Sequence, residues 1–280
     1  MPETNNPLSR FFRQPAIYLR LPSNGRGWTA GSLELPANGE LPVLPMTAMD
    51  EITYRTPDAL FNGEAVVSVI QSCVPNIRDA WAVPITDLDS ILIAIRIASY
   101  GHEMDIDTQC PSCEIETTFG VDLRKLLDGF GGADYATPLT IGDLTISFRP
   151  LDYQQVNANS QLQFENQKSL QAMQTAEMPE ETRLEQVNSM MKKIMEITVH
   201  AIANSIAEIR TPNSIVTEPA FILEFLTNCE RGIFNTIRDH AVSLREKSDL
   251  KPLKIQCPSC QHQYEQAFTL DMARFFESAS

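Results

Sequence analysis

Hydrophobic and polar positions along the chain predict a series of short helices and strands. The most apolar run, residues 91–98, lies in a stretch with the pattern of a helix, residues 85–100. This run contains Arg96 and has eight residues, whereas a bilayer span needs about 20, so it predicts a core helix. Further helices are predicted at 64–71, 221–229 and 233–244, and short strands at 17–21, 41–44, 118–122, 145–148 and 267–270.

A long helical segment is predicted in the second half of the chain. Residues 153–176 are rich in Gln and Asn, and residues 180–203 carry apolar side chains at helical spacing. Because Met178-Pro179-Glu180 separates the two stretches, we expect a helical hairpin over residues 153–203. A hairpin this polar cannot bury both faces, which is typical of a surface that packs onto another chain.

Four of the six cysteines form two Cys-Pro-Ser-Cys knuckles and indicate a metal site. The two pairs are Cys110 with Cys113 and Cys257 with Cys260. Two C-x-x-C pairs complete a tetrahedral four-thiolate shell, which Zn²⁺ favours in structural sites. The alternatives are two separate partial sites, a disulfide framework and a thioredoxin-like redox motif. Two copies in matching contexts, in a chain with no secretory signal, favour one shared zinc ion.

The knuckles are 144 positions apart, far more than in a compact zinc ribbon. One ion would therefore clamp two remote stretches of the chain together. His102 and His262 lie close to the knuckles and are alternative ligands, although histidines so placed more often support ligands or stay exposed.

The knuckles belong to a longer internal repeat. In both halves a strand and a proline-containing turn precede helices, a knuckle, a second strand and a short helix, expected at 124–127 and 273–277. The expected fold class is α+β: two pseudo-repeated halves of short strands and helices joined by a shared four-cysteine zinc site, with a long helical hairpin insertion. We expect residues 1–14 to be a flexible N-terminal arm, 15–132 the N-terminal half, and 133–280 the C-terminal half with the hairpin 153–203.

Charge and composition limit the classes of partner. The chain has 280 residues with 22 Lys+Arg against 36 Asp+Glu, a formal charge of −14. Binding to nucleic acid or anionic lipid depends on clustered Lys and Arg, so the acidity argues against both. The N-terminus lacks the basic-then-apolar pattern of a signal peptide, and we expect synthesis in a reducing cytoplasm.

No pattern of an active site is present in the sequence. The phosphate-binding, dinucleotide-binding and H-E-x-x-H zinc motifs are missing, and so is the G-x-S-x-G nucleophile motif. The four histidines are scattered, and a four-thiolate shell has no open position for a water molecule. We therefore expect a protein that is not an enzyme.

A series of short motifs resembles one protein family. The segments 21–25 (Leu-Pro-Ser-Asn-Gly) and 42–51 (Pro-Val-Leu-Pro-Met-Thr-Ala-Met-Asp-Glu) resemble the opening of the T-even-like bacteriophage baseplate hub proteins. The resemblance continues through Asp58-Ala59-Leu60, Ile70-Gln71-Ser72-Cys73, the helix 87–100, the first knuckle and Asp122-Leu123. It covers residues 15–130, with the second knuckle unit as a further copy.

The resemblance implies a structural or assembly protein of a contractile phage tail, in the hub or inner wedge of the baseplate. It also implies other baseplate and tail proteins as partners, a symmetric assembly of several copies, and location in the virion tail. Three alternatives stay open: an assembly chaperone absent from the virion, a zinc-ribbon nucleic-acid-binding protein and a zinc enzyme. The acidic residues around the first knuckle argue against nucleic acid.

Overall fold

A computed structural model of the chain describes residues 6–56, 61–131, 133–175, 180–268 and 275–276, without the side chains of residues 170, 172–175 and 180–183. The chain divides into two compact units. Unit 1 contains residues 1–80, 87–130 and 250–280, and unit 2 contains residues 81–86 and 131–249. The two halves expected from the sequence, residues 15–132 and 133–280, were defined by an internal repeat and not by compactness. The internal repeat stays a prediction.

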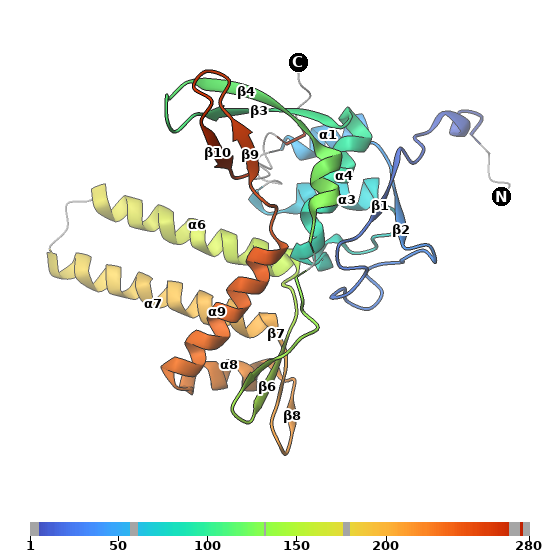
Figure 1. Ribbon diagram of the computed structural model, residues 1–280. Helices are drawn as coiled ribbons and strands as arrows, with labels where there is room; N and C mark the ends of the chain where they lie inside the picture. The colour runs from blue at the N-terminus through green and yellow to red at the C-terminus, as the bar shows by residue number, and fades with distance from the viewer. Residues whose placement is uncertain (1–5, 57–60, 132, 176–179, 269–274, 277–280) are drawn as a thin grey trace. The chain divides into compact units, whose positions relative to one another are not determined.

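Unit 1 consists of helices and three separate antiparallel hairpins or strand pairs, β1–β2, β3–β4 and β9–β10 (Figure 1). Its elements in chain order are η1 (Ser9–Phe11), β1 (Ile17–Arg20), β2 (Glu40–Val43), α1 (Ala48–Tyr54), α3 (Glu64–Cys73), α4 (Ile85–Tyr100), β3 (Glu103–Gln109), β4 (Glu116–Asp122), α5 (Leu123–Gly129), β9 (Leu253–Gln256) and β10 (Gln263–Gln266). A 3-10 turn, η2 (Ala80–Ala82), precedes α4.

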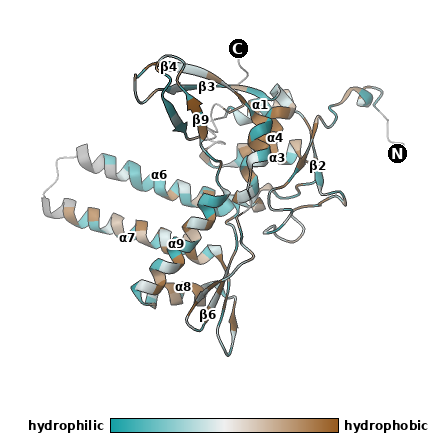
Figure 2. Cartoon of the chain, in the orientation of Figure 1, coloured by the Kyte–Doolittle hydropathy of each residue, from teal (hydrophilic) through white to brown (hydrophobic). Residues whose placement is uncertain are grey.

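Helix α4 supplies much of the core of unit 1. Its residues 91–95 are all completely buried, and Figure 2 shows the helix as largely apolar. A helix that is apolar on every side needs packing partners on every side. In helix α3, which packs against α1, Ala65, Val69 and Ile70 are also fully buried. The expected core helix is confirmed.

Arg13 fixes the end of the N-terminal arm. Its guanidinium donates to the carbonyl oxygens of Pro45 (2.8 Å) and Ser72 (2.7 Å), and to the carboxylate of Asp50 (3.2 Å). Thr47 and Asp50 form the capping box of α1. Burial raises the pKa of Asp50, but hydrogen bonds from Thr47 and Ser72 and the charge of Arg13 together hold it below its ordinary value.

A buried carboxylate fixes the loop that follows β1. Asp87, at the start of α4, accepts hydrogen bonds from the amide (2.9 Å) and hydroxyl (2.5 Å) of Ser23 and from the indole of Trp28 (2.8 Å). Burial raises the pKa of Asp87, although these hydrogen bonds oppose the effect. The Leu-Pro-Ser-Asn-Gly segment is therefore a turn fixed by hydrogen bonds to Asp87, and Gly25 in it has a φ of 81°.

Unit 2 is a four-stranded antiparallel sheet with helices packed against it. The strands lie in the order β5 (Leu139–Ile141), β6 (Leu144–Phe148), β7 (Ile206–Arg210), β8 (Ile215–Val216). The helices are α6 (Tyr153–Thr175), α7 (Glu180–Ser205), α8 (Pro219–Asn228) and α9 (Arg231–Ser248). Buried side chains of β6, β7, the end of α7, α8 and α9 form one core: Ile146, Phe148, Ile202, Ile206, Ile209, Ile222, Leu226, Ile237 and Leu244.

Helices α6 and α7 lie beside each other and are the two longest helices among the described residues, and both carry many polar side chains (Figures 1 and 2). They occupy the region 153–203 in which the sequence predicts a helical hairpin. The connection at 176–179, with the predicted Met178-Pro179 break, lies outside the described residues. None of the helices in the described part of the chain is long and apolar enough to cross a membrane.

The remaining local predictions can be compared element by element. The predicted helices at 64–71, 221–229 and 233–244 are present as α3, α8 and α9, each shifted or extended by a few residues. Asp122 caps α5 as expected, since its carboxylate accepts from the Arg124 amide (3.0 Å). Half of the strand expected at 267–270 and three of the five residues of the helix expected at 273–277 lie outside the described residues; the described residues 267–268 are not in a strand, and 275–276 are in a turn. Strands β3, β7, β8, β9 and β10 were not expected.

Candidate metal centre

Each Cys-Pro-Ser-Cys knuckle lies in the turn of a two-stranded hairpin. β3 and β4 flank Cys110 and Cys113, and β9 and β10 flank Cys257 and Cys260. The last strand pairs before the turns are Gln109 with Glu116 in the first hairpin and Gln256 with Gln263 in the second. Antiparallel pairing thus holds each knuckle at the tip of a short ribbon.

The two knuckles have the same internal hydrogen bonds. In the first, the amide of Glu114 donates to the carbonyl of Cys110 (2.9 Å), and the amide of Cys110 donates to the carbonyl of Ile115 (3.1 Å). The second knuckle has both bonds at the corresponding residues, from Gln261 to Cys257 (3.0 Å) and from Cys257 to His262 (2.9 Å). One local conformation is therefore built twice.

A glutamine supports each knuckle from the preceding strand. The side-chain amide of Gln109 donates to the carbonyl of Glu114 (3.1 Å), and that of Gln256 donates to the carbonyl of Gln261 (3.5 Å). Both carbonyls belong to left-handed residues, with φ of 59° and 61°. Sequence reasoning missed these glutamines, although the signal is the five-residue string Gln-Cys-Pro-Ser-Cys, which occurs twice.

The structure brings the four predicted cysteines together. Their sulfur atoms all lie within 4.8 Å of one another, with Cys110 and Cys260 at 3.7 Å and Cys113 and Cys257 at 3.7 Å. Four sulfurs each about 2.3 Å from one ion in a tetrahedron would be about 3.8 Å apart. The spacing therefore fits a metal ion held by all four thiolates.

The same distances do not fit disulfide bonds. A disulfide has its two sulfurs about 2.0 Å apart, and all six cysteines are free thiols here. Cys73 and Cys229 lie outside the cluster. Cys73 is buried beside Arg13 (3.8 Å), and burial raises its pKa to about 12.

Backbone amides prepare the cluster for deprotonation. Hydrogen bonds from the amides of Cys260 and Ser259 lower the pKa of Cys257 to about 7. The amide of Ile115 also lowers the pKa of Cys113, but burial and hydrogen bonds with the other three thiols together raise it to about 12. Four adjacent thiols cannot all ionise without a cation, which is the usual condition of a metal site before loading.

A buried threonine joins the two hairpins next to the cysteines. The hydroxyl of Thr108 on β3 donates to the side chain of Gln266 on β10 (2.9 Å) and lies 3.3 Å from the hydroxyl of Tyr264. Thr108 is 6% exposed, so these hydrogen bonds are shielded from water. The hairpins are thus aligned by polar contacts as well as by the cysteines.

Neither histidine near the knuckles belongs to the cluster. His102 precedes β3 and accepts, through its carbonyl, a hydrogen bond from the Leu123 amide (2.8 Å). His262 is exposed, and its ring stacks on that of Tyr264 with centroids 6.3 Å apart. Among the described residues, the metal-ligating group is formed by the cysteines alone.

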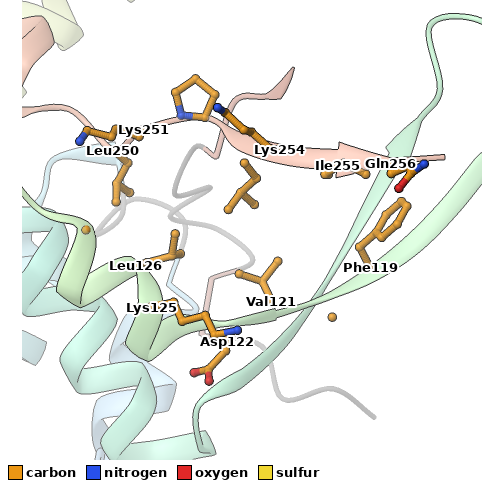
Figure 3. A pocket seen from close by; sticks show the side chains of 14 residues that line it. Phe119, Val121, Asp122, Lys125, Leu126, Leu250, Lys251, Lys254, Ile255 and Gln256 are labelled. Carbon is orange, nitrogen blue, oxygen red and sulfur yellow. The ribbon is translucent and has the colours of Figure 1, made fainter. Parts of the chain in front are cut away.

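An open cavity of about 470 Å³ lies between β4, α5 and β9, beside the hairpins that carry the knuckles (Figure 3). Val121, Leu126 and Leu250 contribute apolar side chains to it. Three further lining residues are cationic: Lys125, Lys251 and Lys254. The cavity contains no histidine or cysteine in its described lining, so it is separate from the thiol cluster.

Comparison with known proteins shows the family. The family described as "T4 bacteriophage base plate protein" matches residues 35–277, which is most of the chain and includes both knuckles. The chain belongs to this family. The predicted resemblance to T4-like baseplate proteins is therefore confirmed, and it extends well past the residues 15–130 on which it was based. Comparisons with curated proteins and with solved structures gave no match.

Membership of the family makes the chain a phage baseplate protein in general terms. The family match spans both Gln-Cys-Pro-Ser-Cys strings and the polar helices α6 and α7, which the motif resemblance could not reach. The thiol cluster is thus part of the region that matches the family. Its chemistry is that of a four-cysteine group able to hold a metal ion.

Proposed function

We propose that this baseplate protein is a structural component of the hub or inner wedge of a contractile phage tail, with a zinc ion bound by Cys110, Cys113, Cys257 and Cys260. The ion would join the hairpin of β3 and β4 to that of β9 and β10. One observation carries the proposal: four sulfurs from hairpins 144 residues apart converge to the spacing of a metal tetrahedron.

Zinc suits this group better than the other metals that bind sulfur. A closed shell of four cysteines is typical of structural zinc, and zinc has no redox chemistry that would make the site reactive. Iron also binds four cysteines, but it would colour the protein, whereas zinc would not. Metal analysis of the purified chain, with its absorption spectrum, separates the two.

The role we propose is non-catalytic. A four-thiolate shell leaves no position for a water molecule or a substrate, so the ion would stabilise the fold and perform no chemistry. Acidic side chains are exposed along β3 and β4, including Glu103, Asp105, Asp107 and Glu116. This distribution weighs against a nucleic-acid interface at the knuckles.

Other baseplate and tail proteins are the partners we propose. Two regions offer exposed apolar side chains for such contacts. The N-terminal arm exposes Leu8, Phe11 and Phe12 next to its anchor at Arg13, and the predicted hairpin 153–203 exposes apolar residues of α6 and α7. Large apolar side chains in water are typical of surfaces that are covered in an assembly.

The experiment that tests the role is an inventory of purified phage particles by mass spectrometry after chemical cross-linking. The proposal expects the chain in intact particles, cross-linked to other baseplate proteins. Presence in infected-cell lysate only, with no copy in washed particles, would instead support an assembly chaperone, which needs the same exposed surfaces during assembly but leaves before completion.

A further inference from the structure

Helix α7 exposes a row of apolar side chains that the described part of unit 2 leaves uncovered. Leu184, Met191 and Met195 are 63%, 58% and 69% exposed. Asn188, between them, is exposed as well. At 3.6 residues per turn these four residues lie within about 60° of arc on one side of the helix. On the opposite side, Met190 is 7% exposed, so that side faces the protein.

The spacing of this row is that of a coiled-coil seam. From 184 to 188, 191 and 195 the steps are four, three and four residues, the alternation of a and d positions in a heptad. Leu184 and Met191 occupy d positions, and Asn188 and Met195 occupy a positions. We call these four residues the α7 seam.

The two flanks of the α7 seam differ in chemistry. Glu185 and Lys192, both exposed, occupy the e positions on one flank. On the other flank, Val187 is partly buried, and Ile194 is 44% exposed. One flank therefore offers one charge of each sign, and the other offers apolar contact.

We propose that the α7 seam pairs antiparallel with the α7 seam of a second copy of this chain. About a two-fold axis between residues 189 and 190, Leu184 would meet Met195 of the second copy, and Asn188 would meet Met191. In an antiparallel pair, e positions face e positions, so Glu185 would meet Lys192 of the second copy, and the axis forms this ion pair twice.

Charge complementarity selects this arrangement over the parallel one. In a parallel pair, equal residues lie side by side, and Glu185 would be about 10 Å from Lys192 of the partner along the axis, because seven residues separate them. The two ion pairs are then lost. Only the antiparallel register pairs the opposite charges and also places Val187 against Ile194 of the second copy.

The contact is short and therefore weak by itself. The α7 seam extends over about 16 Å of helix, so the pair would bury less than the roughly 1,200 Å² of a stable interface. Copies already held in one baseplate would pair at high effective concentration, which makes a weak contact sufficient. The inference thus names one partner for the 153–203 surface and rests on the proposed baseplate role for its setting.

Charge-swap variants of the full, zinc-loaded chain test the pairing. Sedimentation equilibrium from about 1 to 100 μM is expected to show a monomer–dimer equilibrium for the unaltered chain. Glu185→Lys and Lys192→Glu should each weaken it at least tenfold, because like charges then face each other twice. An equimolar mixture of the two variants should associate again, since both ion pairs form in the mixed dimer. The double variant should dimerise like the unaltered chain.

The mixture distinguishes pairing from a simple loss of structure. A variant that only damages the helix cannot be rescued by another damaged chain, and circular dichroism checks that helix content is unchanged. A monomeric unaltered chain across this range, or association that ignores both charge swaps, would overturn the inference. Failure of the proposed baseplate role would appear instead in the particle inventory, which does not depend on these variants.

Discussion

Cys257→Ser is the most direct perturbation of the proposed zinc site. Cys257 is 1% exposed, and its sulfur is 3.7 Å from that of Cys113 and within 4.8 Å of all three others. The substitution removes one of four ligands and leaves a hydroxyl that is a poor zinc ligand in its place. The ion is then held by three thiolates, two of them from the other hairpin.

The size of the effect follows from the energy of a structural zinc site. Zinc binding contributes about 10–16 kcal/mol in small zinc-binding peptides, so one of four ligand bonds corresponds to about 2.5–4 kcal/mol. For a unit of 150–250 residues, 1 kcal/mol changes Tm by about 2–4 °C. We therefore expect Tm to fall by about 5–15 °C, a loss comparable with that from truncating a large buried side chain to Ala.

The assay combines metal analysis with thermal unfolding in zinc-containing buffer. The unaltered chain is expected to carry one zinc per chain, and Cys257→Ser less than one, with the lower Tm. Cys229→Ser is the matched control, because Cys229 is a half-buried free thiol outside the cluster. It should keep the full zinc content.

Removal of the metal ion from the unaltered protein should also destabilise it. A strong chelator should lower its Tm at least as far as Cys257→Ser does, because chelation removes all four ligand bonds and the substitution removes one. If the variant and the chelated protein both kept the Tm and the metal content of the untreated chain, a shared site would be refuted.

Two other predictions concern charged groups of unit 1. Arg13→Ala should lower the free energy of unfolding by about 2–3 kcal/mol, because it leaves the 9%-exposed side chain of Asp50 without its cation. Arg20→Ala is the control, because Arg20 pairs with Glu40 in solvent, and it should lower the free energy of unfolding by less than about 0.5 kcal/mol. Denaturant titrations measure both values. Hydrogen bonds from Arg124 lower the pKa of Asp122 from 3.8 to about 2, so ionised Asp122 stabilises the folded state above about pH 4, and this contribution is lost as the pH falls towards 2. Thermal unfolding should therefore show a lower Tm for Asp122→Asn at pH 6 and a shrinking difference from the unaltered chain between pH 4 and 2.

Each of these predictions has a clear contrary result. Equal losses for the two arginine variants would mean that burial of the Arg13 contacts adds nothing. A difference between Asp122→Asn and the unaltered chain that stays constant down to pH 2 would mean that the Asp122 carboxylate is not the group responsible.

The sequence predicts local features of this fold better than the pairing of distant segments. The apolar run 91–98 could only be a buried helix, and Asp122 before Leu123 could be recognised as a cap from its chemistry. Strand β3 was missed although its sequence, Glu-Met-Asp-Ile-Asp-Thr-Gln, has the polar–apolar alternation of a strand, because Asp and Glu are uncommon in strands and its pairing partner is β4. Strand β9 has four residues, too few for a reliable period.

The thiol cluster could be predicted across 144 residues because the number of ligands that a metal ion needs does not depend on their separation in the sequence. One knuckle supplies two of the four ligands that a structural zinc ion needs, so the presence of one knuckle predicts a second. The hydrogen bonds of Gln109, Gln256 and Thr108 could not be predicted in this way. A glutamine or threonine has many possible partners, and only the folded hairpins show which backbone carbonyl or side chain each one meets.

Unit 1 combines residues before 131 with residues after 249, and this has a consequence for its synthesis. Residues 6–130 leave the ribosome early, but β9 and β10 follow only after the whole of unit 2 has been translated. A nascent chain can therefore fold unit 2 while its first unit still waits for its last strands. A chain that ends before β9 would lack two of the four sulfurs and could not complete the thiol cluster.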